Sequence, residues 1–76
     1  MGSSLQEHIG LEVRRRRQKR RLTLRELAWS AGVSRETLIA VEHGKTNFTL
    51  ATLEGIARAL KCSTRNLLPH GLEGMG

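Results

Sequence analysis

The sequence has little cysteine, proline or aromatic side chain: its 76 residues include one Cys, one Pro, one Trp, one Phe and no Tyr. A single cysteine excludes an intrachain disulfide framework and fits a reducing cytoplasm. No long apolar run is present, so we expect neither a membrane span nor a secretory signal. The histidines and Cys62 are too scattered for a metal site, because zinc ligands usually come in closely spaced pairs. We therefore expect no metal, no other cofactor and, without an acid–base constellation, no enzyme.

Acidic residues are also few. Seven Asp and Glu stand against thirteen Lys and Arg, which gives a formal net charge of +6 and favours a polyanionic partner. Seven of the basic residues lie together in the run Arg14–Arg21, RRRRQKRR. Two interpretations of this run stay open, a solvated helix face or a patch that grips nucleic-acid backbone. The short length allows one small domain with a modest core, which favours a compact helical bundle or an oligomer.

Two short helices joined by a tight turn are predicted between Leu24 and His43, LRELAWSAGVSRETLIAVEH. Thr23 and Glu26 form a capping box that opens the first of these helices. Gly32 supplies the positive φ that ends it, and Ser34 caps the next helix. A glycine turn of this kind makes the second helix protrude, as a helix that reads the DNA major groove must.

The motif and its surroundings resemble the phage repressor and Cro (Xre-type) helix-turn-helix family. The matching elements are Arg17, Leu22 with Thr23, Leu27 with Ala28, Gly32 with Val33 and Ser34, Glu42 with Gly44, and the run Leu53–Leu60. The similarity extends from about Ile9 to Leu68. The resemblance implies an all-α, compact five-helix, lambda-repressor-like DNA-binding domain with the helix-turn-helix at its second and third helices. It also implies a bacterial or phage protein that acts in the cytoplasm, at the nucleoid. The segment Lys45–Leu50 is similar to a turn of restriction–modification controller proteins.

Apolar spacing and caps predict where the five helices lie. The expected helices run from Leu5 or Ile9 to Arg20, from Leu24 to Ala31, from Arg35 to His43, from a Thr49 cap to Leu60, and from a Ser63 cap to Leu67 or Leu68. Pro69 ends the last one. On the fourth helix we expect a buried side made of Leu50, Leu53, Ile56, Ala57 and Leu60. We expect residues 1–8 to be a flexible segment, residues 9–69 the domain, and residues 70–76 a flexible tail.

The first turns of the third helix are expected to contact base edges. Arg35 can bond a guanine through two hydrogen bonds or settle on a phosphate. Glu36 can accept from a cytosine amino group, or it can complement the positive end of the helix dipole. Thr37 and Ala40 can offer methyl groups to thymine, and Thr37 can also hydrogen-bond.

Contacts to the DNA backbone are expected from helix N-termini and from the loop after the third helix. Resemblance places them at Thr23, Arg25, His43, Lys45, Thr46 and Asn47, and the cap residue Ser34 joins this set. For His43 a phosphate contact and a simple helix-closing role both stay open. The family often has Gln where this chain has Leu24, so that phosphate contact is missing here, and Arg25 is a substitute for it.

Resemblance also implies a structural ion pair between Arg17 and Glu42. A planar guanidinium suits a carboxylate with two parallel hydrogen bonds, and the pair would hold the third helix on the first. Two alternatives stay open: a neighbouring arginine pairs with Glu42 instead, or Glu42 is a surface acid.

One small domain reads too few base pairs to select a site in a genome, so we expect a sequence-specific transcriptional regulator that binds a palindromic operator as a homodimer. Exclusion and resemblance put the dimer contact at Asn66, Leu67, Leu68, Phe48 and Leu72. At least one of Leu67 and Leu68 is expected to complete the monomer core instead.

Other functions stay open. One is an antitoxin or protein-interaction module that masks a toxin or recruits RNA polymerase. Another takes the arginine-rich run as an RNA-binding segment, although such segments need no folded reader beside them. Trp29 has an outward position on the second helix, where it can cover a neighbouring helix, stack near the sugar-phosphate backbone or mark a partner surface.

Overall fold

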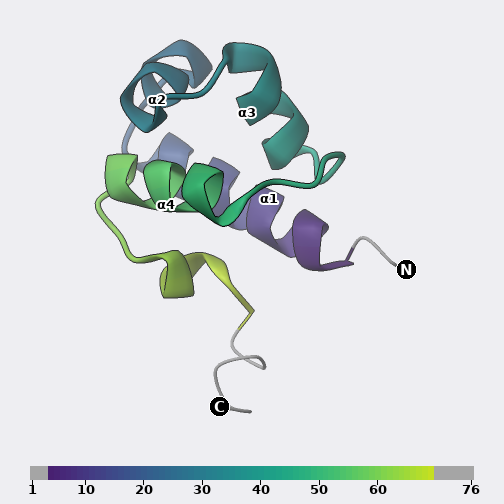
Figure 1. Cartoon of the computed structure of the whole chain (residues 1–76). Helices are drawn as coiled ribbons and strands as arrows, with labels where there is room; N and C mark the ends of the chain where they lie inside the picture. The colour runs from purple at the N-terminus through teal and green to yellow at the C-terminus, as the bar shows by residue number, and fades with distance from the viewer. Residues whose placement is uncertain (1–3, 70–76) are drawn as a thin grey trace.

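The computed structural model describes residues 4–69, which form four α-helices and one short 3-10 helix and contain no strand. The elements are α1 (Ser4–Lys19), α2 (Leu24–Ala31), α3 (Arg35–Glu42), α4 (Leu50–Ala59) and the 3-10 helix η1 (Thr64–Leu67). In Figure 1, α2 and α3 lie together on one side of the molecule, with α1 and α4 beneath them. The tail expected over residues 70–76 lies outside the described residues, as do residues 1–3.

Of the two expected starts of the first helix, Leu5 and Ile9, the structure favours the earlier one, because α1 starts at Ser4. Residues 4–8, expected to be flexible, belong to this helix. A tertiary contact supports its first turns, in which Gln6 Nε2 donates to Asn47 Oδ1 at 2.7 Å. Glu7 in the first turn also complements the helix dipole and lies against Gly44. The loop after α3 therefore holds the start of α1 in place.

The short fifth helix expected after the Ser63 cap is a 3-10 helix of four residues. Asn66 Oδ1 accepts from the Ser63 N–H at 3.0 Å and closes the turn at its start. Leu68 has already returned to extended backbone (φ −92°, ψ 155°), as the residue before a proline favours. Between these two constraints only one turn forms, which is the length typical of a 3-10 helix.

The core collects one apolar side from each element. Its buried members are Ile9, Val13, Leu27, Ala28, Leu38, Val41, Leu53, Ile56, Ala57, Leu60 and Leu67. The expected inward positions of α4 are confirmed except at Leu50, which is 65% exposed. Leu50 is the first residue of α4 and directly follows the exposed cap Thr49. It lies one helical turn before Leu53, where the buried side of α4 begins.

The turn between α2 and α3 forms as its residue types predict. Thr23 Oγ1 accepts from the Glu26 N–H at 3.0 Å, and Glu26 Oε1 accepts from the Thr23 N–H at 2.8 Å, which completes the capping box. Gly32 lies in the left-handed region (φ 74°), and the Val33 N–H then donates to the Ala28 carbonyl at 3.0 Å. The chain thus reverses within three residues and begins α3.

Two helix crossings are close enough to need glycine. A Cβ at Gly55 of α4 would lie 2.6 Å from the carbonyl oxygen of Ala31 at the end of α2. A Cβ at Gly10 of α1 would lie 2.4 Å from the carbonyl oxygen of Val41 in α3. Such contacts do not occur between real atoms, so α2 rests on α4 and α3 rests on α1 through backbone. Among residues 4–69, no helix has both the length and the apolar character needed to cross a membrane.

Candidate nucleic-acid interface

The first turn of α3 presents polar side chains to solvent. Arg35, Glu36 and Thr37 are exposed, whereas Ala40, one turn further on, is half-buried. The Ser34 hydroxyl caps the helix by accepting from the Thr37 N–H at 3.0 Å, and it donates to Thr37 Oγ1 at 2.9 Å. Thr37 Oγ1 thus serves as an acceptor within the first turn, while its O–H hydrogen and its methyl group stay available.

An ion pair holds the other end of α3 on α1. Arg17 Nε donates to Glu42 Oε2 at 2.7 Å, and Nη2 donates to Oε1 at 3.1 Å. The Glu42 side chain is only 5% exposed and that of Arg17 13% exposed. Arg17 Nη1 donates in addition to the Leu22 carbonyl at 2.9 Å, just before α2 begins. This guanidinium therefore joins α1, α3 and the chain that enters α2, in the pairing that the resemblance implied.

Gly10 sets the distance between α1 and α3, and sequence reasoning missed this role. Its ideal Cβ position meets the carbonyl oxygens of Val41 and Glu42 at 2.4 and 2.7 Å. Because Glu42 also forms the ion pair, the glycine and the pair act on the same turn of α3. The available signal was a glycine inside a helical pattern, which usually has a packing or functional reason.

The start of α2 and the end of α3 meet beside α1. A hollow of about 140 Å³ is lined there by Arg14, Arg17, Leu24, Glu42 and His43. Leu24, in place of the family's frequent Gln, is half-buried and turns no polar group outward. Arg14 is exposed at the rim of this hollow. Arg25, the substitute considered from sequence, is exposed on α2 beside Trp29 and Arg35.

The loop after α3 is partly engaged in internal hydrogen bonds. One ring nitrogen of His43, Nδ1, lies 2.8 Å from the Ile39 carbonyl, so the imidazole helps to close α3. Thr46 Oγ1 donates to the Asn47 carbonyl at 3.1 Å, and the Asn47 side chain accepts from Gln6. Lys45 is exposed, and its side chain forms no hydrogen bond or ion pair with another of the described residues.

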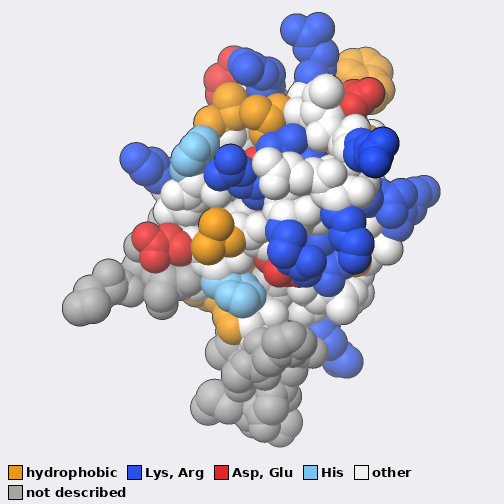
Figure 2. Space-filling view, turned by 180° about the vertical axis from the view of Figure 1, so that it is seen from behind, with side chains coloured by type: hydrophobic (Ala, Val, Ile, Leu, Met, Phe, Trp, Pro, Cys, Tyr) orange, Lys and Arg blue, Asp and Glu red, His pale blue; other side chains and the backbone are white. Residues whose placement is uncertain are grey.

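The basic run Arg14–Arg21 is divided by the fold into groups with different roles. Arg17 is buried in its ion pair, and Glu12 accepts from Arg15 at 2.5 Å and from Arg16 at 2.7 Å. The hydrogen bond from Arg15 holds the pKa of the Glu12 carboxyl below its usual value. Figure 2, which turns α1 toward the viewer, shows Lys and Arg side chains spread over this face with few acids among them.

Cys62, His8 and His43 lie within the described residues. Among residues 4–69, no three His, Cys, Asp or Glu side chains gather closely enough to hold a metal ion. The Cys62 thiol is half-buried against the core, and burial raises its pKa. His70 lies outside the described residues.

The expected dimer residues are distributed unevenly over the surface. Leu67 is fully buried in the monomer and completes the core between α1 and α4, as expected for at least one of Leu67 and Leu68, so it has no surface left for a dimer contact. Phe48 and Leu68 are half-buried, and Asn66 is exposed. Leu72 lies outside the described residues.

A short exposed helix, capped at one end and anchored by a buried ion pair at the other, within a basic four-helix domain, is typical of small DNA-binding proteins. Residues 13–67 match the helix-turn-helix family, and the chain belongs to that family. No curated protein sequence matches it significantly.

Solved structures with the same fold include regulators and one enzyme. The restriction–modification controller protein C.AhdI from Aeromonas hydrophila is 28% identical, with 83% of this chain and 96% of that chain covered and a TM-score of 0.81. The clp gene regulator ClgR from Corynebacterium glutamicum is 30% identical, with 92% and 74% covered and a TM-score of 0.81. Hydroxypropylphosphonic acid epoxidase from S. wedmorenis is 28% identical, with 88% and 36% covered and a TM-score of 0.79. The family and the regulators together support a DNA-binding regulator, whereas the likeness to the enzyme spans only about a third of that enzyme's chain.

Proposed function

We propose that this protein is a sequence-specific transcriptional regulator that binds a palindromic operator as a homodimer, with α2 and α3 as its helix-turn-helix. The observation that carries the proposal is the exposed first turn of α3, held at its far end by the Arg17–Glu42 pair. A helix that enters the major groove by its N-terminal end needs both free side chains there and a fixed angle of approach.

Base recognition is assigned to α3. Arg35 donates two hydrogen bonds to a guanine, and Glu36 accepts from a cytosine amino group. Thr37, whose Oγ1 accepts from Ser34, offers its methyl group to a thymine and keeps its O–H as a donor, and Ala40 offers a methyl group one turn deeper. A single bidentate arginine contributes about 1–3 kcal/mol of discrimination, so the arginine carries the largest share.

Backbone contacts surround this helix. Thr23 and Arg25 face one strand at the start of α2, with Ser34 at the start of α3. Lys45, with Thr46 and Asn47, grips the other strand. Arg14, at the rim of the hollow beside Leu24 and His43, supplies the phosphate contact that Leu24 cannot make.

The dimer contact is assigned to Phe48, Asn66 and Leu68, which keep exposed area after the monomer has folded. Sedimentation equilibrium at micromolar concentration, with and without operator, tests this assignment. The assignment would be refuted if the free protein has the mass of a monomer and if each operator binds only one protein chain.

The operator is found by selecting bound sequences from a random duplex library, and half-site symmetry in the selected sequences would also report the dimer. Fluorescence anisotropy then compares the operator with random duplex and with RNA. We expect a preference for the operator of about a thousandfold or more. Equal affinity for all three would leave only sequence-blind charge attraction and would refute the proposal.

Two variants separate base contacts from backbone contacts in the same assay. Arg35→Ala should lower operator affinity by about 5- to 150-fold and relax the choice of one base pair, as expected for a loss of about 1–3 kcal/mol. Lys45→Ala should weaken all duplexes alike and reduce the salt slope by about 1. If Arg35→Ala weakens random duplex as much as operator, Arg35 contacts phosphate.

A second candidate, a protein-interaction module for a toxin or RNA polymerase, is favoured by Trp29. Its side chain is 87% exposed, so it covers no neighbouring helix, and it borders a hollow of about 300 Å³ with Arg25, Ala28, Val33 and Arg35. Large exposed aromatic groups often mark contact surfaces. Trp29→Ser should leave operator affinity unchanged if Trp29 serves a protein partner, and should lower it if the ring stacks on the DNA backbone.

A further inference from the structure

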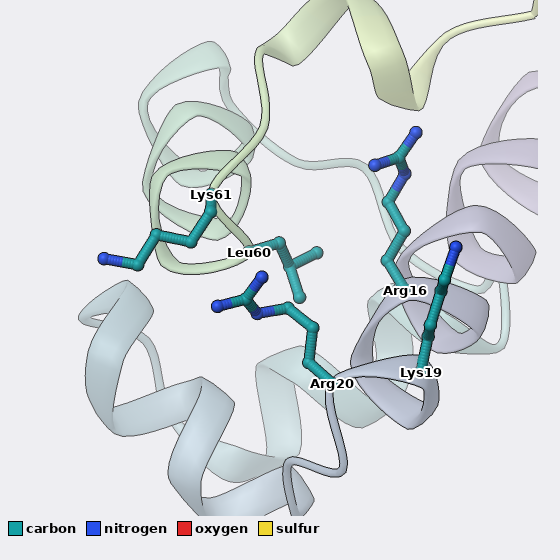
Figure 3. A pocket seen from close by; sticks show the side chains of 5 residues that line it. All are labelled: Arg16, Lys19, Arg20, Leu60 and Lys61. Atoms are coloured by element: carbon teal, nitrogen blue, oxygen red, sulfur yellow. The ribbon is translucent and has the colours of Figure 1, made fainter.

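A basic pocket opens between the ends of α1 and α4. It has a volume of about 490 Å³ and is lined by Arg16, Lys19, Arg20, Leu60 and Lys61. In Figure 3, Arg20 extends from the end of α1 toward Leu60 and Lys61, while Arg16 and Lys19 stand further along the same helix. None of these residues belongs to α3 or to the loop after it. We refer to this site as the α1–α4 pocket.

The α1–α4 pocket carries more positive charge than its surroundings neutralise. Arg16 shares the Glu12 carboxylate with Arg15. No ion pair to Lys19, Arg20 or Lys61 is recorded among residues 4–69. A hollow lined by positive side chains has a positive electrostatic potential that attracts anions. The low dielectric constant of the surrounding protein strengthens this potential inside the hollow.

Lys61 stands at a backbone position that favours glycine. Its φ is 60°, in the left-handed region, where a side chain raises the energy by about 1–2 kcal/mol. The turn is held by the Lys61 N–H on the Arg58 carbonyl and the Cys62 N–H on the Ala57 carbonyl, both at 3.0 Å. Helices usually end on glycine in this turn, and this chain places a cation there instead.

The helix dipole accounts for only part of this arrangement. Cations in the last turn of a helix are favourable wherever they point around its axis, which explains basic residues at the end of α1. It does not explain why Arg20 of one element and Lys61 of another border the same hollow. Cations from two elements held by separate turns make a site that is partly formed before any ligand arrives.

We propose that the α1–α4 pocket binds a compact, multiply charged phosphate compound, such as a polyphosphate or the phosphate end of a nucleotide. Its volume lies in the range of small-molecule sites, about 300–1,000 Å³. Arginine forks and lysine ammonium groups are the usual protein partners of phosphate oxygens. This inference does not depend on α3 reading DNA.

The test titrates sodium tripolyphosphate into the full chain by isothermal calorimetry, at constant ionic strength set with chloride. The pocket variant is Arg20→Gln with Lys61→Gln. Its matched control is Arg21→Gln with Arg58→Gln, which also removes two positive charges, from exposed positions that belong neither to the pocket nor to the proposed DNA contacts. We expect saturable one-to-one binding that weakens at least tenfold in the pocket variant and stays within about twofold in the control. The same ligand should raise the Tm of the parent and not that of the pocket variant.

Three results would overturn the proposal. The first is that tripolyphosphate shows no saturable binding to the parent. The second is that both variants bind tripolyphosphate equally weakly, which would show a response to net charge alone. The third is displacement of tripolyphosphate by an unrelated duplex from a variant with Arg25→Gln and Lys45→Gln, which lacks two of the proposed DNA backbone contacts. That result would make the pocket a second DNA contact. Circular dichroism checks folding, and Lys61→Gly, which relieves the left-handed backbone, replaces Lys61→Gln if that variant unfolds. Operator selectivity of the pocket variant, measured separately, distinguishes failure here from failure of the proposed regulator.

Discussion

Replacing Glu42 with alanine should unfold this domain at a much lower temperature, because it leaves a buried guanidinium without its carboxylate. The Arg17 side chain is 13% exposed and would keep only the Leu22 carbonyl, at 2.9 Å, as a partner. Removing one member of a buried pair lowers the free energy of unfolding by about 3–5 kcal/mol. The remaining carbonyl and partial exposure place this site near about 3 kcal/mol.

The predicted change in Tm follows from the size of the domain. A loss of 1 kcal/mol shifts the Tm of a domain of 60–100 residues by about 4–8 °C, so Glu42→Ala should lower it by about 12–24 °C. Thermal and urea unfolding followed by circular dichroism measure the change. Glu54→Ala, at an exposed position of α4, is the matched control and should stay within about 0.5 kcal/mol of the parent.

Two further variants separate charge from packing. Glu42→Gln keeps the side-chain volume and one acceptor, so it should lower the free energy of unfolding by less than Glu42→Ala does. Arg17→Met combined with Glu42→Leu removes both charges, and it should be more stable than Glu42→Ala because no unpaired ion remains. If Glu42→Ala melts within about 2–4 °C of the parent, the range expected for Glu54→Ala, the ion pair does not hold α3 on α1.

Four other measurements test the structure. Arg21 has a φ of 58°, so Arg21→Gly should raise the free energy of unfolding in urea by about 1 kcal/mol, and a decrease would contradict the left-handed cap. Gly10→Ala should lower it by about 1–3 kcal/mol and weaken operator binding, since α3 must move; unchanged stability would mean that the crossing is looser. Because Arg15 lowers the pKa of Glu12, their ion pair should stabilise the fold above about pH 4.5 and lose this effect as the pH falls through the lowered pKa. Glu12→Gln should therefore make the free energy of unfolding depend less on pH in that range. An identical pH dependence in the parent and the variant would exclude the pair. Burial raises the pKa of the Cys62 thiol, so disulfide reagents at pH 8 should modify it more slowly in the native protein than in urea, and equal rates would show an open thiol.

The caps and the turn between α2 and α3 could be predicted because their hydrogen bonds join residues close in sequence. Thr23 with Glu26, Ser34 with Thr37, and Gly32 carry the whole local geometry. The residue types alone therefore indicated where both helices begin and where the first ends. The ion pair of Arg17 with Glu42 spans 25 positions, and it could be anticipated only through resemblance to a family.

Tertiary structure decided burial and pairing where local patterns did not. Leu50 was expected on the buried side of α4 and Leu67 at a dimer contact or in the core, and Leu50 is 65% exposed whereas Leu67 is fully buried. The early start of α1 is supported by a contact between Gln6 and Asn47, 41 residues apart. The arginine run gives one contiguous charge in sequence, and folding divides it among a buried pair, the Glu12 carboxylate and the α1–α4 pocket. The physical reason is that caps and turns are local hydrogen bonds, whereas burial and charge pairing depend on which distant elements pack against a residue.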